Sequence, residues 1–167
     1  MNAFKFGGVL PRSPRLFPTA LFLLLSIFFS ARLIIQPAWA GPALDLGKQS
    51  GKVVYLDFWA SWCIPCKKSF PWMWAMTQKY GPKGFVVLTV NLDKEEKLIQ
   101  QFLADFPPMD LAVIRDPAGA LATEWKVETM PTSFILDKKG KVRYTHKGFR
   151  ANEIAEYESH IAELVSE

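Results

Sequence analysis

The chain has 167 residues, of which 20 are basic and 16 acidic, and its formal net charge is +4. That length allows one ordinary domain with a proper core and a short additional segment. Four of the basic residues lie in residues 1–40, which contain no acid, so the rest of the chain carries 16 residues of each sign. This neutrality argues against nucleic acid and against a charged membrane surface as binding partners.

Residues 1–40 have the organisation of a secretory signal peptide. A basic beginning is followed by an almost wholly apolar run from Leu16 to Ala31, and Ala38-Trp39-Ala40 supplies the small-x-small pattern of a signal-peptidase site. The alternative is an uncleaved inner-membrane anchor, since the run approaches spanning length if residues 33–35 are added. Arg32 interrupts that longer run, so we favour cleavage after Ala40 and export to the periplasm.

Residues 41–52 are interpreted as a lead-in, and the folded domain is expected over residues 53–167. Its first strand is predicted from Val53 to Ala60, because this run is apolar on both faces, like a parallel strand buried between helices. Asp57 breaks the apolar pattern, and a buried carboxylate is unfavourable unless it has a task or a partner. We therefore interpret Asp57 as a functional residue rather than a solvated strand end.

The only two cysteines, Cys63 and Cys66, follow this strand and precede a helical pattern. A closed zinc site needs about four ligands, but there is no second cysteine pair, and His146 and His160 stand alone near the C-terminus. A structural disulfide across two intervening residues would constrain little of the unfolded chain. The spacing therefore predicts a redox-active pair and no metal site, and we expect both histidines at the surface without a function.

A helix that begins at or just after Cys63 would explain the chemistry of this pair. The Cys63 sulfur would lie over unpaired backbone N–H groups at the positive end of the helix dipole, and both features favour the thiolate that attacks disulfides. Pro65 suits the first turn because its missing N–H is not needed there. Cys66 lies about one turn deeper, so we predict Cys63 as the exposed attacking thiol and Cys66 as the resolving thiol.

Residues 57–67 (Asp-Phe-Trp-Ala-Ser-Trp-Cys-Ile-Pro-Cys-Lys) resemble the active-site signature of the thioredoxin superfamily. The Trp-Cys-x-Pro-Cys form, followed by Phe-Pro-Trp at residues 70–72, resembles the exported TlpA/ResA-like branch, and the similarity extends from about Gly51 to the C-terminus. The resemblance implies that Asp57 passes protons to and from the resolving thiol. It also implies that Trp59 supports the active site and that Trp62 contacts the substrate.

The elements that follow fit this branch. A helix is expected from Pro65 to Tyr80, then a buried strand from Phe85 to Asn91, an amphipathic helix to about Phe106 and a short strand at residues 111–114. Small thioredoxins lack this helix-plus-strand insertion, whereas TlpA/ResA-like proteins and peroxiredoxins have it. ResA-like proteins also place a glutamate near the site in the loop after the second strand, but residues 93–95 (Asp-Lys-Glu) do not match it clearly, and no role is transferred.

Met130-Pro131 precedes a predicted strand, Ser133–Leu136. In the superfamily the proline at this place is cis and packs beside the dithiol. The resemblance implies that Pro131 keeps backbone donors and metal ions away from the sulfurs, and that the Met130 backbone pairs with a substrate peptide. A hairpin with a returning strand at residues 142–145 and a closing helix from Asn152 to about Val165 complete the chain.

We therefore expect an α/β protein with a three-layer thioredoxin fold, in which a mixed central sheet has helices on both faces. The predicted function is an exported thiol–disulfide oxidoreductase that reduces protein disulfides through Cys63 and Cys66. No flavin or nicotinamide motif is present, so we expect no cofactor. Electrons are expected to come from a membrane or periplasmic donor. We also expect a monomer.

Other functions remain open from the sequence. A net oxidant or isomerase would use the same motif, because direction depends on the redox potential. A role in cytochrome c assembly is disfavoured. The members of this branch that are specialised for that role carry Gly-x-Pro-Glu at the proline loop, whereas this chain has Thr-Met-Pro-Thr at residues 129–132. The peroxidatic Thr-x-x-Cys pattern is absent. A carrier of Cu(I) would use the soft thiolates, but accessory ligands near Cys63 and Cys66 are not evident.

Overall fold

The computed structural model describes residues 44–167. The predicted signal peptide of residues 1–40 lies outside this described part. Within residues 44–167, no helix has both the length and the hydropathy that a membrane crossing requires. A short 3-10 helix, Leu46–Gln49, lies in the lead-in segment before the sheet.

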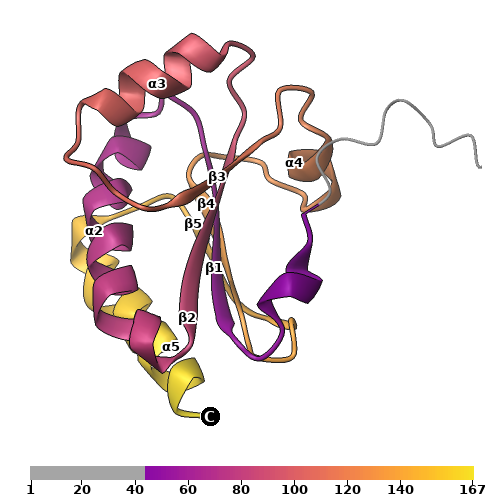
Figure 1. Cartoon of the computed structure of the whole chain (residues 1–167), viewed down its shortest axis with the longest axis vertical. Coiled ribbons are helices and arrows are strands. Elements are labelled where there is room, and N and C mark those ends of the chain that lie inside the picture. The colour runs from indigo at the N-terminus through magenta and orange to yellow at the C-terminus, as the bar shows by residue number, and fades with distance from the viewer. Residues whose placement is uncertain (1–43) are drawn as a thin grey trace, which may run out of the picture. The chain divides into compact units, whose positions relative to one another are not determined.

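One five-stranded mixed sheet forms the centre of the domain (Figure 1). Its strands are, in chain order, β1 (Val53–Trp59), β2 (Phe85–Asn91), β3 (Ala112–Arg115), β4 (Thr132–Leu136) and β5 (Val142–Lys147). They lie in the order β3-β2-β1-β4-β5, with β1, β2 and β3 parallel and with β4 and β5 each antiparallel to the neighbouring strand. The strand β1 is therefore central, and all seven of its residues are buried, as its continuous apolar run predicts.

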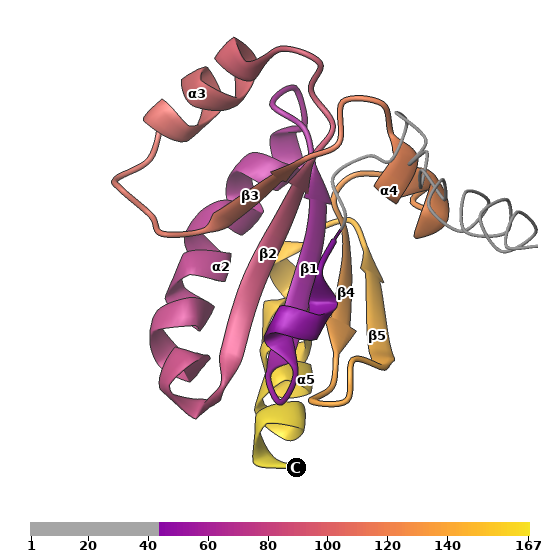
Figure 2. The same ribbon diagram turned by 45° about the vertical axis from the view of Figure 1, so that its right-hand side comes forward.

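Helices cover both faces of this sheet (Figure 2). The helices α2 (Ile64–Tyr80) and α5 (Ile154–Ser166) lie together on one face, and α3 (Glu96–Ala104) packs its buried residues into the same core cluster. The short helix α4 (Ala120–Glu124) contributes to a second core cluster on the opposite face. The predicted three-layer thioredoxin fold is confirmed, and β3 is the strand of the predicted insertion, added at one edge of the sheet.

The register of the sheet places polar residues of three strands side by side. Asp57 in β1 is directly opposite Ser133 in β4, and Ser133 is directly opposite His146 in β5. Directly opposed residues of antiparallel strands project to the same face, which here is the face covered by α2 and α5. A row of three polar side chains therefore crosses the sheet beneath these two helices.

Candidate active site

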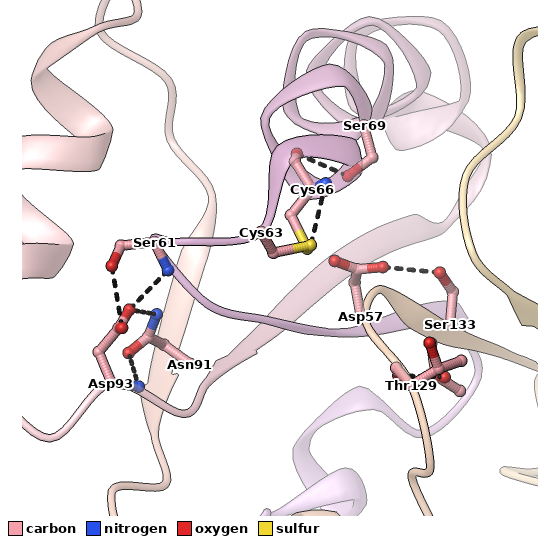
Figure 3. The surroundings of a disulfide bond; sticks show 10 residues. Asp57, Ser61, Cys63, Cys66, Ser69, Asn91, Asp93, Thr129 and Ser133 are labelled. Atoms are coloured by element: carbon pink, nitrogen blue, oxygen red, sulfur yellow. Dashed lines mark hydrogen bonds between the residues drawn. A yellow bond between two sulfur atoms is a disulfide. The ribbon is translucent and has the colours of Figure 1, made fainter.

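Cys63 and Cys66 form a disulfide at the N-terminus of α2 (Figure 3), with their Cα atoms 5.3 Å apart. Cys63 is the N-cap residue, and its sulfur accepts a hydrogen bond from the backbone N–H of Cys66 at 3.2 Å. Pro65 lies in the first helical turn, where its lack of an N–H leaves no helical bond unmade. The structure thus places a sulfur where the N–H groups and the helix dipole favour negative charge.

The two sulfurs differ in their access to the surface. Cys63 is 4% exposed and borders a shallow surface pocket of about 200 Å³, whereas Cys66 is fully buried. The expectation of an exposed Cys63 is therefore wrong for this disulfide form, in which Cys63 is buried except for a small edge. The neighbouring Trp62 and Ile64 are 69% and 74% exposed, so the Cys63 edge lies within an apolar surface. Of the two cysteines, Cys63 therefore has the better access to the surface, which is compatible with the predicted order of attack.

Asp57 is fully buried in the middle of β1. Its Oδ1 accepts a hydrogen bond from the Ser133 hydroxyl at 2.6 Å, and its Oδ2 has no hydrogen-bond partner among the described residues. Burial raises the pKa of Asp57 to about 7, and the Ser133 hydrogen bond opposes that rise. At neutral pH this carboxyl group can therefore both accept and release a proton, which is the property required of a proton carrier beside a dithiol.

Ser133 and Tyr55 lie beside Asp57, although no sequence motif singles out either residue. Tyr55 is two residues before Asp57 on the same face of β1, and its hydroxyl lies 2.8 Å from the Ser133 Oγ. Burial is the largest cause that raises the pKa of Tyr55 well above its ordinary value, and the nearby Asp57 is the second. The Tyr55 hydroxyl therefore remains protonated. The alternation along β1 indicates that Tyr55 and Asp57 share a face, but the register with β4 is not visible in a single sequence.

The loop that contains Met130 and Pro131 leads into β4, the strand that pairs with β1 next to Asp57. The Met130–Pro131 peptide bond is cis, Pro131 is buried and Met130 is half-buried. The Pro131 carbonyl accepts a hydrogen bond from the Gly148 N–H at 2.7 Å, and the Thr132 hydroxyl donates to the Thr129 carbonyl at the same distance. These bonds fix the backbone on both sides of the proline.

Trp59 is enclosed at the end of β1. Its ring centroid lies 4.7 Å from that of Phe70 in α2 and 4.6 Å from that of Phe102 in α3, and Trp59 is fully buried. Trp59 therefore joins the strand that carries Asp57 to the helix that carries the cysteines. This contact is consistent with the expected supporting role, and it also ties the insertion helix α3 to the site.

A buried carboxylate holds the loop that leads into Cys63. Asp93, which follows β2, accepts hydrogen bonds from the Ser61 backbone N–H at 2.8 Å and from the Ser61 hydroxyl at 2.9 Å (Figure 3). The Asn91 side chain donates a third hydrogen bond to the same carboxylate at 2.8 Å. Asp93 lies in the loop where a glutamate of ResA-like proteins was expected near the site, but its hydrogen bonds here are with Ser61 and Asn91.

Replacing Asp93 by asparagine is expected to lower the free energy of unfolding by about 2 kcal/mol, because hydrogen bonds to a buried charged group are lost or weakened. Urea denaturation at pH 7 measures this change. Asp110→Asn is the matched control, since Asp110 is an exposed carboxylate and its replacement is expected to change little. Equal stability of the Asp93 variant and the control would show that these hydrogen bonds do not hold the loop that leads into Cys63.

The histidines are not both at the surface, and that expectation is wrong for His146. Its side chain is buried beneath α5, and its Nε2 lies 3.0 Å from the Nδ1 of His160. Burial, with a smaller effect of His160, lowers the pKa of His146 to about 4, so the ring is neutral at pH 7. Within residues 44–167, no cluster of three or more His, Cys, Asp and Glu side chains is arranged to hold a metal ion.

The fold and the site together define a thioredoxin-fold protein with a Cys-x-x-Cys pair at a helix N-terminus. The profile of the Redoxin family matches residues 37–161. The chain therefore belongs to the Redoxin family.

The chain is similar in sequence to proteins named as thiol–disulfide oxidoreductases or thioredoxin-like proteins. The chain is 33% identical over 113 residues to the thiol-disulfide oxidoreductase ResA of Bacillus thuringiensis, which covers 68% of this chain and 65% of that protein. It is 35% identical over 112 residues to the thioredoxin-like protein YneN of Bacillus subtilis, covering 65% of this chain and 64% of the relative. The matched segments thus span just under two thirds of the length of these relatives.

Solved structures show the same fold. A protein of Chlorobium tepidum assigned as a thiol:disulfide interchange protein DsbE is 46% identical, with a TM-score of 0.69 over 72% of this chain and 84% of that chain. The exposed lipoprotein thioredoxin Etrx1 of Streptococcus pneumoniae is 34% identical, with a TM-score of 0.62 over 71% of this chain and 90% of that chain. Both similarities cover most of the compared structure.

Proposed function

We propose that this protein is a thiol–disulfide oxidoreductase that reduces disulfides in other proteins. One observation carries the proposal: the Cys63–Cys66 disulfide caps α2, and only Cys63 reaches the surface. The buried Asp57, with a pKa of about 7, supplies a proton carrier under the fully enclosed Cys66. The names of the ResA and DsbE relatives support the same class of reaction.

The reaction begins with the reduced dithiol. The Cys63 thiolate attacks one sulfur of the substrate disulfide, a bond forms between them, and the second substrate sulfur leaves and takes up a proton. Asp57 then accepts the proton of the Cys66 thiol, and the Cys66 thiolate attacks the Cys63 sulfur. The first substrate sulfur leaves and is protonated in turn. Two electrons have passed to the substrate, and the protein ends as the Cys63–Cys66 disulfide.

The surface around Cys63 would bind the substrate through apolar contacts and backbone pairing. Trp62 and Ile64 line the same surface pocket as Cys63 and are the most exposed large hydrophobic residues in the described chain. Met130, next to the cis-proline, would offer its backbone to an extended peptide, and Pro131 would keep competing donors from the sulfurs. An extended segment with an apolar residue beside its cysteine fits this surface.

The proposed setting is the periplasm, with the protein exported by residues 1–40 and either cleaved after Ala40 or retained as an inner-membrane anchor. The composition of those residues supports export. An oxidising compartment closes an exposed dithiol, so repeated reduction of substrates needs a membrane or periplasmic electron donor. The proposal includes a monomer that uses no cofactor of its own.

The redox potential of the Cys63–Cys66 pair tests the direction of electron flow. Equilibration of the purified protein with glutathione or dithiothreitol, followed by quantification of free thiols, gives this potential. A value near about −270 mV, as in thioredoxin, is expected for a reductant, and the protein should then reduce insulin in the presence of dithiothreitol. A value near about −120 mV, as in a strong periplasmic oxidant, would overturn the reductant assignment.

A further inference from the structure

The hydroxyl of Ser133 is the only hydrogen-bond donor that the described residues direct at the carboxyl group of Asp57, at 2.6 Å from Oδ1. An ionised carboxylate can only accept hydrogen bonds, so Ser133 must use its single proton for Asp57. The Tyr55 hydroxyl, 2.8 Å away, then donates to the Ser133 oxygen. Tyr55, Ser133 and Asp57 thus form a chain of hydrogen bonds in which each donor is directed toward the carboxylate.

The two oxygens of Asp57 have different surroundings. Oδ1 is bonded to Ser133, whereas Oδ2 is buried without a partner among the described residues. In Figure 3 the carboxylate lies between Ser133 and the disulfide, with its unbonded oxygen on the side of the sulfur atoms. A hydrogen bond at Oδ1 limits rotation of the carboxylate, so it keeps Oδ2 directed at the cysteines.

We propose that Ser133, itself held by Tyr55, is a positioning residue that keeps Asp57 oriented toward Cys66 and favours its ionised form. The role rests on the proposed function, because it matters for catalysis only if Asp57 takes the proton of Cys66. Ser133 does not touch the substrate or the sulfurs in this assignment. It acts through Asp57, and Tyr55 acts through Ser133.

The surroundings of Asp57 offer no substitute for this hydrogen bond. The titratable groups around this hydrogen-bond chain are Tyr157 on α5, which lies near Tyr55, His146 on β5, which is opposite Ser133, and Cys66 on α2, which Figure 3 shows beside Asp57. None of these is a cation near pH 7, since His146 is neutral there. Burial disfavours the ionised carboxylate, and Ser133 is the one group among the described residues found to oppose that effect. On β2, the residue opposite Asp57 is Thr89, whose hydroxyl donates to the Ala112 carbonyl instead.

The direct test is titration of Asp57 followed by the ¹³C signal of its carboxyl carbon, in the oxidised protein and assigned with Asp57→Asn. In Ser133→Ala, the midpoint is expected to move to higher pH by about one to two pH units, because a hydrogen bond to the charged form is lost. Ser133→Thr retains a hydroxyl and should restore most of the original midpoint. Tyr55→Phe keeps Ser133 and should give a smaller upward shift.

Thr89→Val is the matched control, because it removes a buried hydroxyl from the neighbouring strand without altering a bond to Asp57. Its midpoint is expected to equal that of the unmodified protein, even if its stability falls as much as that of Ser133→Ala. The pH at which insulin reduction is half-maximal should follow the same order among the variants. An unchanged Asp57 midpoint in both Ser133→Ala and Tyr55→Phe would overturn the inference.

The titration separates this inference from the proposed function. If the unmodified protein fails to reduce insulin while the midpoint still moves in Ser133→Ala, the proposed function is wrong and Ser133 still sets the proton affinity of Asp57. If insulin is reduced and the midpoint does not move, the reductase assignment stands and the positioning role is wrong.

Discussion

Cys63→Ser is expected to abolish insulin reduction, with a loss of more than about a thousandfold relative to the unmodified protein. Of the two cysteines only Cys63 has any exposed surface, and a serine hydroxyl at that position cannot form the bond to a substrate sulfur. The rate of insulin precipitation in the presence of dithiothreitol measures the effect. Because the disulfide closes a very short loop, the variant should remain folded, which circular dichroism would verify.

Cys66→Ser is the matched counterpart, and it should stop the reaction at a different step. Its Cys63 can still attack, but the mixed disulfide cannot be resolved, so a covalent complex with the substrate should accumulate. Non-reducing electrophoresis and mass spectrometry would detect this complex, and dithiothreitol should release it. Normal turnover by Cys66→Ser, or a trapped complex in Cys63→Ser, would contradict the assigned order of attack.

Asp57→Asn is expected to stabilise the protein at neutral pH and above, while slowing catalysis. The pKa of Asp57 is raised from 3.8 to about 7 in the folded state. The folded protein therefore binds more protons than the unfolded chain between these values, and its stability falls as the pH rises through this window. Asparagine does not ionise, so at pH 8 the variant should gain about 2–4 kcal/mol in the free energy of unfolding relative to the unmodified protein.

The same variant should lose about a hundredfold in the rate of insulin reduction at pH 7, because the proton of Cys66 has no acceptor. Urea denaturation of both proteins at pH 4 and pH 8 separates the stability effect, since the gain should nearly vanish at pH 4. Parallel stability curves for the two proteins over this range would contradict the raised pKa. Unchanged turnover would exclude Asp57 as the proton carrier.

Much of this molecule follows from local sequence patterns. The continuous apolar runs at residues 53–60 and 85–91 predict the buried strands β1 and β2, and the structure confirms both with a difference of one residue at the end of β1. The Cys-x-x-Cys spacing after a strand similarly predicts a cysteine at a helix start, and Cys63 is the N-cap of α2. These features depend on neighbouring residues along the chain, so a single sequence contains them.

Contacts between distant segments could not be predicted in the same way. Asp57 stands out because a carboxylate in an apolar strand is unusual, but Ser133, 76 positions away, is an ordinary residue in its own strand. Asp93 likewise resembles, in the sequence, a solvated acid before a helix. In the structure it is buried and accepts hydrogen bonds from Ser61. The long-range partner of a polar side chain leaves no local pattern.

The burial of His146 shows most directly why contacts between distant segments could not be predicted from the sequence. Val142 and Tyr144 alternate with Arg143 and Thr145 along β5, so His146 shares a face with the two apolar residues, but the sequence does not indicate what covers that face. The pairing of β5 with β4 sets His146 opposite Ser133, and the packing of α5 brings His160 against it. The sequence by itself determined the elements, their order and the reactive pair, because those depend on local composition. The proton affinity of Asp57 was decided only by the tertiary structure, because it depends on strand register and on burial beneath the helices.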